Sequence, residues 1–505
     1  MTSTTAPPSR ASTAGRLALI VASLGVLVAW IVVIAITVPQ AQSIGPQPNG
    51  DYGFFTAVAE RLVAGDRLYI DIWDNKDPLV FYSIALARSL GIWGAWVLEV
   101  LWVAAAAVAV WSLGRWSHIP RELALFAAWA ATPLLIVGLP YFMGSTHVPA
   151  ISLTLVAVAG TVRNRPWLTG LVLAALLFFK LIVLPVAFVA VGFGALVMRR
   201  GTSPMSLRPF LGRVAIAFGA GVVAVIALLA LRGELLPYVN AQIANVLYSQ
   251  TPIVPVEDPS LFRWVLQHIV TLVNPHVFAV LLTTGGLLLW FAVALRSKAN
   301  SSERTLWWIA AAAFVTEVLI VGAVSKWLHH ALVFAISSAL VVLIVSRGLV
   351  RTTRGQGVLG IVALAAVTYT LMGLPSPSLY VNAVKSIGSN VAAAKQLDRA
   401  SSALADVQPA PVAFIGAGNV VPRSFELTDW PLACRHIAQR HFDSPRNFTE
   451  TLDCLPGAKV VVIAPDAEPR DGFDDYNSFL EQARDEASID RVCSDIDSLL
   501  ICVRL

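Results

Sequence analysis

The sequence predicts a polytopic α-helical membrane protein that ends in a small α/β domain. Hydrophobic residues make up 57% of the 505-residue chain and charged residues only 13%, and the mean hydropathy is +0.71. Soluble domains carry about twice that fraction of charged residues. Apolar stretches long enough to cross a bilayer recur up to residue 375, and strand-like and helical segments follow them.

Eleven apolar stretches are the predicted spans. Residues 1–16 before them are polar and are expected to be disordered, and the first stretch is too long for the apolar region of a signal peptide, which favours a retained span. The spans cover residues 17–38, 93–114, 122–139, 147–162, 167–184, 186–198, 212–231, 275–295, 305–323, 327–346 and 355–374. A further stretch, 78–92, is short, begins at Pro78 and carries Arg88, so we interpret it as an interfacial or re-entrant helix.

The basic residues test this topology. If 78–92 does not cross, six basic clusters, from Arg10 and Arg16 to Arg347, Arg351 and Arg354, all lie on one side of the membrane. Because cytoplasmic loops carry an excess of Lys and Arg, that side is predicted to be the cytoplasm, with the N-terminus. The transmembrane domain (17–375) then places its acidic first loop (39–92) outside the plasma membrane. Short basic clusters between spans are not the basic stripe of a nucleic-acid-binding protein, which excludes nucleic acid as a partner.

Residues 376–505 have the pattern of a small extracytoplasmic α/β domain. Apolar runs at 412–416, 458–465 and 499–505 predict strands, and a helical stretch precedes them. The Gly-x-Gly at 416–418 lacks the rest of a dinucleotide-binding fingerprint, so we interpret it as a turn. All four cysteines lie in this part, which suits an oxidising compartment and up to two disulfides. The pairing stays open; Cys434–Cys454 with Cys493–Cys502 is favoured because the second pair could join neighbouring strands.

The first loop holds an unusual density of carboxylates beside the first span. Phe54, Phe55, Val58 and Leu62 recur at helical spacing, which predicts an amphipathic helix on the membrane surface that ends at Gly65. Asp51 stands immediately before this helix. It is either a helix N-cap, a common role for aspartate in that place, or an acid with a chemical function.

The order of motifs in this loop resembles the GT-C glycosyltransferases. An Asp follows the first span, a short helix closes with Ala-Gly-Asp-x-Leu-Tyr (64–69), and Trp-Asp-x-Lys-x-Pro-Leu-x-x-Tyr follows (73–82). The motif is most similar to the protein O-mannosyltransferase and lipid A aminoarabinose transferase branch, in which Lys-Pro-Pro-Leu-x-Tyr is usual. Here Asp77 replaces the first proline, and Glu99 stands about where the family often has an arginine. Beyond this loop the resemblance is looser and includes the number of spans, the external segment 232–274 and KWLHH (326–330).

The resemblance implies an inverting transfer of a sugar from a polyprenyl-phosphate donor to a lipid, glycan or protein acceptor at the outer face of the membrane. An acceptor hydroxyl attacks the anomeric carbon, and a carboxylate near it acts as general base, a role that the resemblance assigns to Asp51. The departing lipid phosphate needs positive charge or hydrogen-bond donors. The candidates for this role are Lys76, Lys180, Arg263, Lys326, His329 and His330. Mannose and arabinose, in a cell-envelope lipoglycan pathway, are the donor sugars that analogy suggests.

Asp71, Asp74, Tyr82 and His147 are candidates for binding the acceptor or the sugar. The loop at 140–147 offers His147 but no carboxylate, whereas some GT-C enzymes use a second external acid and a divalent cation. We therefore expect no cofactor and no metal dependence. A divalent cation bound by Asp51, Asp71 and Asp74 is the alternative, because hard cations need several converging oxygen ligands.

Each cationic candidate also has a structural interpretation. Lys76 could pair with Asp74 or Asp77 at the interface. Lys326 and the two histidines that follow could anchor the end of a span, and Lys180, within a predicted span, could face a cavity or extend its ammonium group to the membrane surface. A lone histidine such as His147 is more often structural than a metal ligand.

Two other functions compete with transfer. Transporters and flippases for lipid-linked sugars show internal repeats and polar groups near the middle of the membrane, whereas here the polar groups cluster near one face. A non-catalytic scaffold subunit is the third alternative, and the departures at Asp77, Glu99 and His147 are compatible with it. The sequence favours the enzyme, embedded among membrane lipids.

Overall fold

The computed structural model describes most of the helical region and the core of the C-terminal part. The described residues are 50–91, 94–132, 146–199, 206–250, 272, 275–295, 299–324, 328–350, 409–415, 430–436, 445–463, 474–496 and 499–504. The predicted first and last spans (17–38 and 355–374), together with Arg263 and Lys326, lie outside these ranges.

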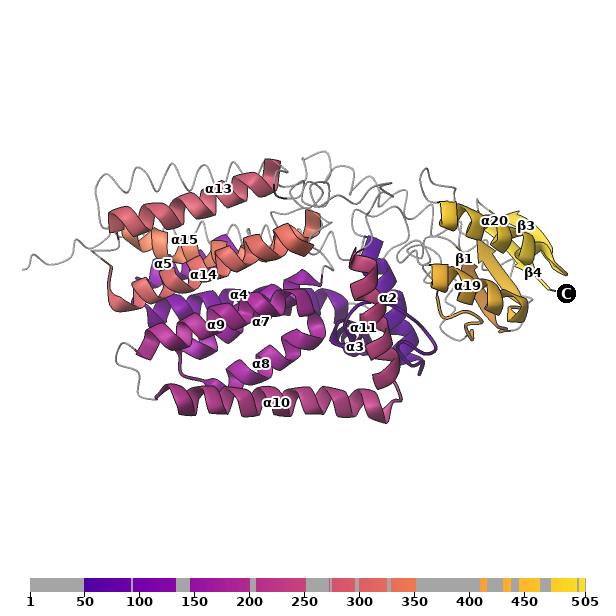
Figure 1. Cartoon of the computed structure of the whole chain (residues 1–505), viewed down its shortest axis with the longest axis horizontal. Coiled ribbons are helices and arrows are strands. Elements are labelled where there is room, and N and C mark those ends of the chain that lie inside the picture. Colours follow the sequence, from indigo (N-terminus) through magenta and orange to yellow (C-terminus); the bar gives the residue numbers. More distant parts are fainter. Residues whose placement is uncertain are drawn as a thin grey trace, which may run out of the picture.

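A helical bundle makes up the larger part of the molecule, and its helices run along the long axis (Figure 1). The helices are α4 (Gly94–Trp116), α5 (Arg121–Phe126), α7 (His147–Val162), α8 (Pro166–Phe179), α9 (Leu184–Arg199), α10 (Leu207–Leu231), α13 (Pro275–Trp290), α14 (Ser301–Val324) and α15 (Ala335–Val350). Two π-helical turns, η1 (Ala127–Ala131) and η3 (Phe291–Leu295), continue α5 and α13. Almost every residue of α7 is buried, whereas α10 exposes large apolar side chains such as Ile216 and Val223, as a lipid-facing helix does.

Three of the described helices are long and apolar enough to cross a membrane: Val97–Trp116, Leu207–Leu231 and Ser301–Gly322. Five shorter apolar helices accompany them. The protein is therefore a polytopic helical membrane protein, while the count of eleven spans and the orientation of the termini stay predictions.

One predicted span is not continuous. The sequence predicts a single helix over 167–184, but α8 ends at Phe179, Lys180 adopts φ −165° and ψ 86°, and a 3₁₀ turn, η2 (Leu181–Val183), leads into α9. The interruption has two causes. The Leu181 N–H donates to the Asp77 carboxylate outside the helix ladder, and Pro185, which lacks an N–H, suits the first turn of a new helix. The predicted span 327–346 likewise begins as a 3₁₀ turn, η4 (Leu328–Phe334), before α15.

Three shorter helices lie at one end of the bundle, between it and the C-terminal sheet: α2 (Gly50–Val63), α3 (Pro78–Ser89) and α11 (Leu235–Gln250) (Figure 1). The predicted apolar face of α2 is confirmed, since Phe54, Phe55, Val58 and Leu62 are all buried. The helix ends at Val63, and Gly65 terminates it as predicted, with φ +109° and a hydrogen bond from the Asp66 N–H to the Arg61 carbonyl.

The predicted position of Asp51 needs a correction. Since α2 begins at Gly50, Asp51 lies in the first turn of the helix and not immediately before it.

The C-terminal part forms a four-stranded sheet in the order β1-β2-β4-β3, where β1 (Val412–Ile415) is parallel to β2 (Val460–Ile463), and β4 (Leu499–Val503) is antiparallel to β2 and to β3 (Val492–Ile496). Helices α19 (Pro445–Cys454) and α20 (Asp474–Ser488), with the short turn η6 (Leu455–Gly457), pack on one face around Phe448 and Phe479. We call residues 409–504 of this description the C-terminal unit. Two disulfides fasten it, Cys434–Cys454 and Cys493–Cys502, which is the favoured pairing. The second joins directly paired residues of β3 and β4.

Candidate functional site

The candidate site is built around Asp77, a buried carboxylate at the start of α3. Its Oδ1 accepts a hydrogen bond from the Tyr238 hydroxyl of α11 at 3.1 Å, and its Oδ2 accepts one from the Leu181 N–H at 3.3 Å. Burial raises the pKa of the Asp77 carboxyl above its ordinary value, and the Leu181 N–H and the positive charges of Lys180 and Lys76 partly oppose that rise. Asp77 therefore connects the first external loop to α11 and to the interruption that follows α8.

The residues just before Asp77 are fixed by side-chain contacts. The Asp74 carboxylate, 2% exposed, accepts the Lys76 N–H at 2.7 Å, and the Tyr69 hydroxyl donates to the Lys76 carbonyl at 2.7 Å. The Lys76 ammonium donates to the Asn75 side chain at 2.9 Å, and Asn75 in turn donates to Asn245 of α11 at 2.9 Å. Lys76 is thus held beside Asp74 through its main chain, while its ammonium group contacts an amide oxygen.

Tyr69 turns the loop through a strained conformation. Its φ of 67° is uncommon for a residue with a large side chain, and its N–H donates to the Ile72 carbonyl at 2.7 Å across the tight turn. The fully buried ring lies 5.5 Å from that of Tyr238. Packing therefore maintains the turn that presents residues 74–77.

A second buried acid, Glu234, holds the loop to the end of α10. Its carboxylate accepts hydrogen bonds from the Leu68 N–H at 2.9 Å, from Arg232 at 2.8 Å and from the Tyr82 hydroxyl. Burial, together with this hydrogen bond, raises the pKa of Tyr82. Tyr82, predicted to bind the sugar or the acceptor, is thus a partner of Glu234, and the Arg232 guanidinium lies 5.6 Å from its ring centre.

Two predicted histidines from distant parts of the chain come together. The ring of His147, buried at the start of α7, lies 5.2 Å from that of His330 in η4. Helix α7 also neighbours η2, which follows Lys180. Sequence analysis identified each histidine separately and did not predict that they pair.

Asp71 lies apart from this assembly. It is partly exposed and forms an ion pair with Arg67 at 3.0 Å, which lowers the pKa of the Asp71 carboxyl. Among the residues that the structure describes, no three His, Cys, Asp or Glu side chains are placed to hold a metal ion. The side chains of Asp51 and His329 are outside the description, as are Arg263 and Lys326, so their predicted roles and the metal alternative involving Asp51 stay predictions.

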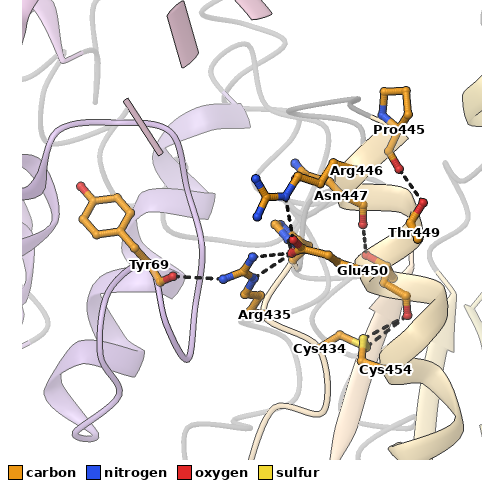
Figure 2. Close-up of polar contacts among 11 residues, drawn as sticks. Tyr69, Cys434, Arg435, Pro445, Arg446, Asn447, Thr449, Glu450 and Cys454 are labelled. Atoms are coloured by element: carbon orange, nitrogen blue, oxygen red, sulfur yellow. Dashed lines mark hydrogen bonds and ion pairs between the residues drawn. A yellow bond between two sulfur atoms is a disulfide. The ribbon is translucent and has the colours of Figure 1, made fainter. Parts of the chain in front are cut away.

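The C-terminal unit contacts this loop directly. The Trp73 N–H donates to the Arg435 carbonyl at 3.0 Å, and Arg61 of α2 donates to the Trp430 carbonyl at 2.7 Å. The Arg435 guanidinium reaches the Tyr69 carbonyl at 3.5 Å, as Figure 2 shows. The loop is therefore held between the helical bundle and the C-terminal unit.

Glu234, Tyr238 and Asn245 are the residues of this site that sequence analysis missed, and Asp77 was noted only as a departure from the motif and as a possible partner of Lys76. All three missed residues follow α10 in a segment predicted only to lie on the outer side. Nothing in the spacing indicates which of its polar side chains turn inward, because their partners are more than a hundred residues earlier in the chain. Chemically, the assembly offers buried carboxylates, two nearby lysines and several tyrosine hydroxyls, which can bind an anion and exchange protons.

Comparison with known structures agrees with this architecture. ArnT from Cupriavidus metallidurans bound to undecaprenyl phosphate is similar over 98% of this chain and 99% of its own, with a TM-score of 0.57 and 14% identity. The apo state of the same protein gives a TM-score of 0.52 at 14% identity over the same shares of the two chains. The apo oligosaccharyltransferase of Archaeoglobus fulgidus gives 0.52 at 12% identity, over 93% of this chain and 73% of its own.

The sequence matches no protein-family model and no curated protein sequence. The structural likeness extends over almost the whole chain, and ArnT, a lipid A aminoarabinose transferase, and the oligosaccharyltransferase share the GT-C fold. The chain therefore has the GT-C membrane fold that its first loop predicts.

Proposed function

We propose that the protein is a membrane glycosyltransferase that takes a sugar from a polyprenyl-phosphate donor and transfers it to an acceptor at the outer face of the plasma membrane. The observation that carries the proposal is the likeness, over 98% of this chain, to ArnT bound to undecaprenyl phosphate. The assembly around Asp77 supports it, since lysines and buried carboxylates gather where the loop meets the bundle.

The lysines supply the chemistry that the leaving group needs. When the bond between the anomeric carbon and the phosphate oxygen breaks, negative charge develops on the lipid phosphate, and cations positioned beforehand stabilise that charge. The positive charges of Lys76 and Lys180 both interact with the buried carboxylate of Asp77. These two lysines are the described candidates for this role. Arg263, Lys326, His329 and His330 remain further candidates of this kind.

Asp51 is the proposed general base. It removes the proton of the acceptor hydroxyl as the oxygen attacks the anomeric carbon, and a single displacement of this kind inverts that centre. Asp71 and Asp74 are the alternatives. Asp74 is buried and bound to the Lys76 N–H, and Asp71 is paired with Arg67, so each already has a structural partner.

Transfer of radiolabelled sugar tests the function and the base together. Membranes that contain the wild type, Asp51→Asn or the control Asp490→Asn are incubated with a series of polyprenyl-phosphate sugars at matched expression. Asp490 is exposed in the C-terminal unit and has φ 53°, a conformation that Asn also tolerates, so the control removes a carboxylate without strain. We expect wild type and control to transfer and Asp51→Asn to lose about a hundredfold or more in rate.

The other outcomes separate the two claims. Undiminished transfer by Asp51→Asn contradicts the assignment of Asp51 as the base, and Asp71 or Asp74 becomes the candidate, while the proposed function stands. If the folded wild type transfers no sugar from any donor, the transferase itself is contradicted, and a flippase or a scaffold subunit becomes the better interpretation.

A further inference from the structure

A pocket lies where the first external loop, α11 and the C-terminal unit meet. Its volume is about 130 Å³, and none of its lining residues is assigned above to the donor or to the base. Its polar and aromatic lining comes from all three parts of the molecule: Tyr69 and Trp73 from the loop, Asn240 from α11, and Arg435, Arg446 and Asn447 from the C-terminal unit.

The lining carries an excess of positive charge. Arg435 and Arg446, which line the pocket, both form ion pairs with one carboxylate, Glu450, as Figure 2 shows. His436 also bonds Glu450, at 2.8 Å, but burial lowers its pKa to about 4, so it is neutral at neutral pH. Among the described residues, this cluster sets two guanidinium groups against one carboxylate, which is an excess of positive charge.

The backbone adds to the attraction for an anion. Arg446 and Asn447 belong to the first turn of α19, a helix of 10 residues that begins at Pro445. The N–H groups of a first turn have no acceptor within the helix, and the helix dipole places partial positive charge there. Helix N-termini are common sites for phosphate and carboxylate groups.

The pocket has room for a small group. Its volume of about 130 Å³ is well above the roughly 10–15 Å³ that one water molecule requires, so a phosphate or carboxylate group can enter it. The ring of Trp73 lies 5.0 Å from that of His436, so the two rings help to fix the wall on the loop side.

We propose that this pocket binds a phosphate or carboxylate group of the acceptor, so that the C-terminal unit and the first loop together select an anionic acceptor. Assignment of the ligand to the acceptor rests on the transferase function proposed above, whereas the anion site itself does not. The guanidinium groups of Arg435 and Arg446 bind the anion by charge-assisted hydrogen bonds, and the dipole of α19 adds partial positive charge at the same place.

Isothermal titration calorimetry of the full-length protein in a neutral detergent tests the site. The probes are inorganic phosphate and glucuronate, which distinguish the two anion classes, and glucose, which is neutral. The variants are Arg446→Gln, at a side chain 73% exposed and therefore tolerant of change, and Arg435→Gln; Arg484→Gln, on the exposed surface of α20, is the matched control. Thermal unfolding verifies that each variant is folded.

We expect at least one of the two anions to bind the wild type and the control equally, with glucose not binding. Loss of one charge-assisted contact is expected to weaken Kd about tenfold or more in Arg446→Gln. The site is overturned if neither anion binds the wild type, if Arg446→Gln binds as tightly as the wild type, or if glucose binds as well as glucuronate. A wild type that binds the anion but transfers no sugar supports the anion site and contradicts the transferase, so the two failures are distinguishable.

Discussion

Glu234 shows how one side chain joins three segments at the site. It is fully buried, and its carboxylate accepts hydrogen bonds from Leu68 in the loop, Tyr82 in α3 and Arg232 beside it. A buried carboxylate is tolerated only when partners satisfy it, and two of these partners, Leu68 and Tyr82, are more than 150 residues away in the sequence. Glu234 therefore fixes the loop without any need to contact a substrate.

Replacement of Glu234 by Gln is expected to destabilise the protein by about 1–3 kcal/mol. The amide oxygen can keep the hydrogen bonds from Leu68 and Arg232, but the NH₂ group then faces Tyr82, whose hydroxyl has to reverse its direction and accept, and the negative charge that attracts Arg232 is lost. Thermal unfolding in detergent measures the effect. Tyr82→Phe, which removes only one hydrogen bond, is expected to lower Tm less. An unchanged Tm for Glu234→Gln would mean that the carboxylate does not hold the loop.

The pKa shifts of His436 and Glu450 predict that the C-terminal unit loses stability as the pH falls. Burial lowers the pKa of His436 to about 4 from 6.5, so between these values the unfolded chain binds the extra proton and stability falls as the pH falls. Burial acts to raise the pKa of Glu450, but hydrogen bonds from His436, Arg435 and Arg446 outweigh it and hold the value at about 2. The stability from Glu450 is therefore present above pH 4.5 and is lost as the pH falls towards about 2.

The variant His436→Gln tests the contribution of the histidine to stability between pH 6.5 and about 4. The Gln side chain does not titrate, so the contribution of residue 436 is removed, and the Tm of the variant is expected to fall less steeply between pH 6.5 and about 4 than the Tm of the wild type. Thermal unfolding as a function of pH gives both slopes. Parallel curves for the two proteins would contradict a buried neutral histidine.

At the scale of elements, the close approach of α8 to α10 depends on a glycine. A Cβ added at Gly170 would lie 2.3 Å from the Val214 carbonyl oxygen and 2.6 Å from the Ala217 Cβ. Small residues let membrane helices pack closely in this way. The interruption at Lys180 follows directly after α8, so the position of this helix also sets the position of the site.

Gly170→Ala is expected to force the two helices apart and to cost about 1–3 kcal/mol of stability, as overpacking does. Gly219→Ala in α10 is the matched control, because nothing lies within 4 Å of a Cβ added there. Thermal unfolding of the purified variants compares them. Equal Tm values would show that the contact is not tight.

The elements that the sequence predicted best are those with one dominant signal. Long apolar runs located the bundle helices, and helical spacing located the buried face of α2. The interruption at Lys180 was missed because hydropathy does not register a main-chain N–H that bonds a distant carboxylate, here Leu181 with Asp77. Strand β3 was anticipated only through the suggestion that Cys493 lies on a strand beside that of Cys502, because the segment contains Ser494 and Asp495 and lies at the edge of the sheet.

The candidate site was predictable in part for the same reason. The loop motif indicated Asp74, Lys76 and Tyr82 because it is local in sequence. Glu234 and Tyr238 complete the site from α10 and α11, and only tertiary packing shows which side chains of that segment turn inward. The pairing of His147 with His330 is likewise a contact between distant segments.

At the scale of the whole molecule, the C-terminal unit and the bundle share the first external loop. The loop bonds the C-terminal unit through Trp73 and Tyr69, and the bundle through Asp77 and Glu234. A ligand bound between the two parts would therefore lie beside the same loop that carries Lys76 and Asp77.

The Cys434–Cys454 disulfide is expected to stabilise this junction. It fastens the segment that carries Arg435 to α19 and closes a loop with a sequence separation of 20, for which chain entropy predicts about 3 kcal/mol. The double variant Cys434→Ser/Cys454→Ser should become more sensitive to limited proteolysis near residues 430–436. Cys493→Ser/Cys502→Ser, within the sheet, is the comparison. Equal protection of that segment in the two variants would contradict a role at the junction.

The measurement that tests the central claim most directly is the binding of polyprenyl phosphate to the purified protein, because it requires no knowledge of the sugar or the acceptor. Wild type, Lys180→Gln and the control Lys459→Gln, an exposed lysine of the C-terminal unit, are titrated with a labelled polyprenyl phosphate. If the assembly around Asp77 binds the donor phosphate, Lys180→Gln weakens Kd about tenfold or more while the control matches the wild type. Equal affinity in all three proteins, or no binding by the wild type, would contradict the account.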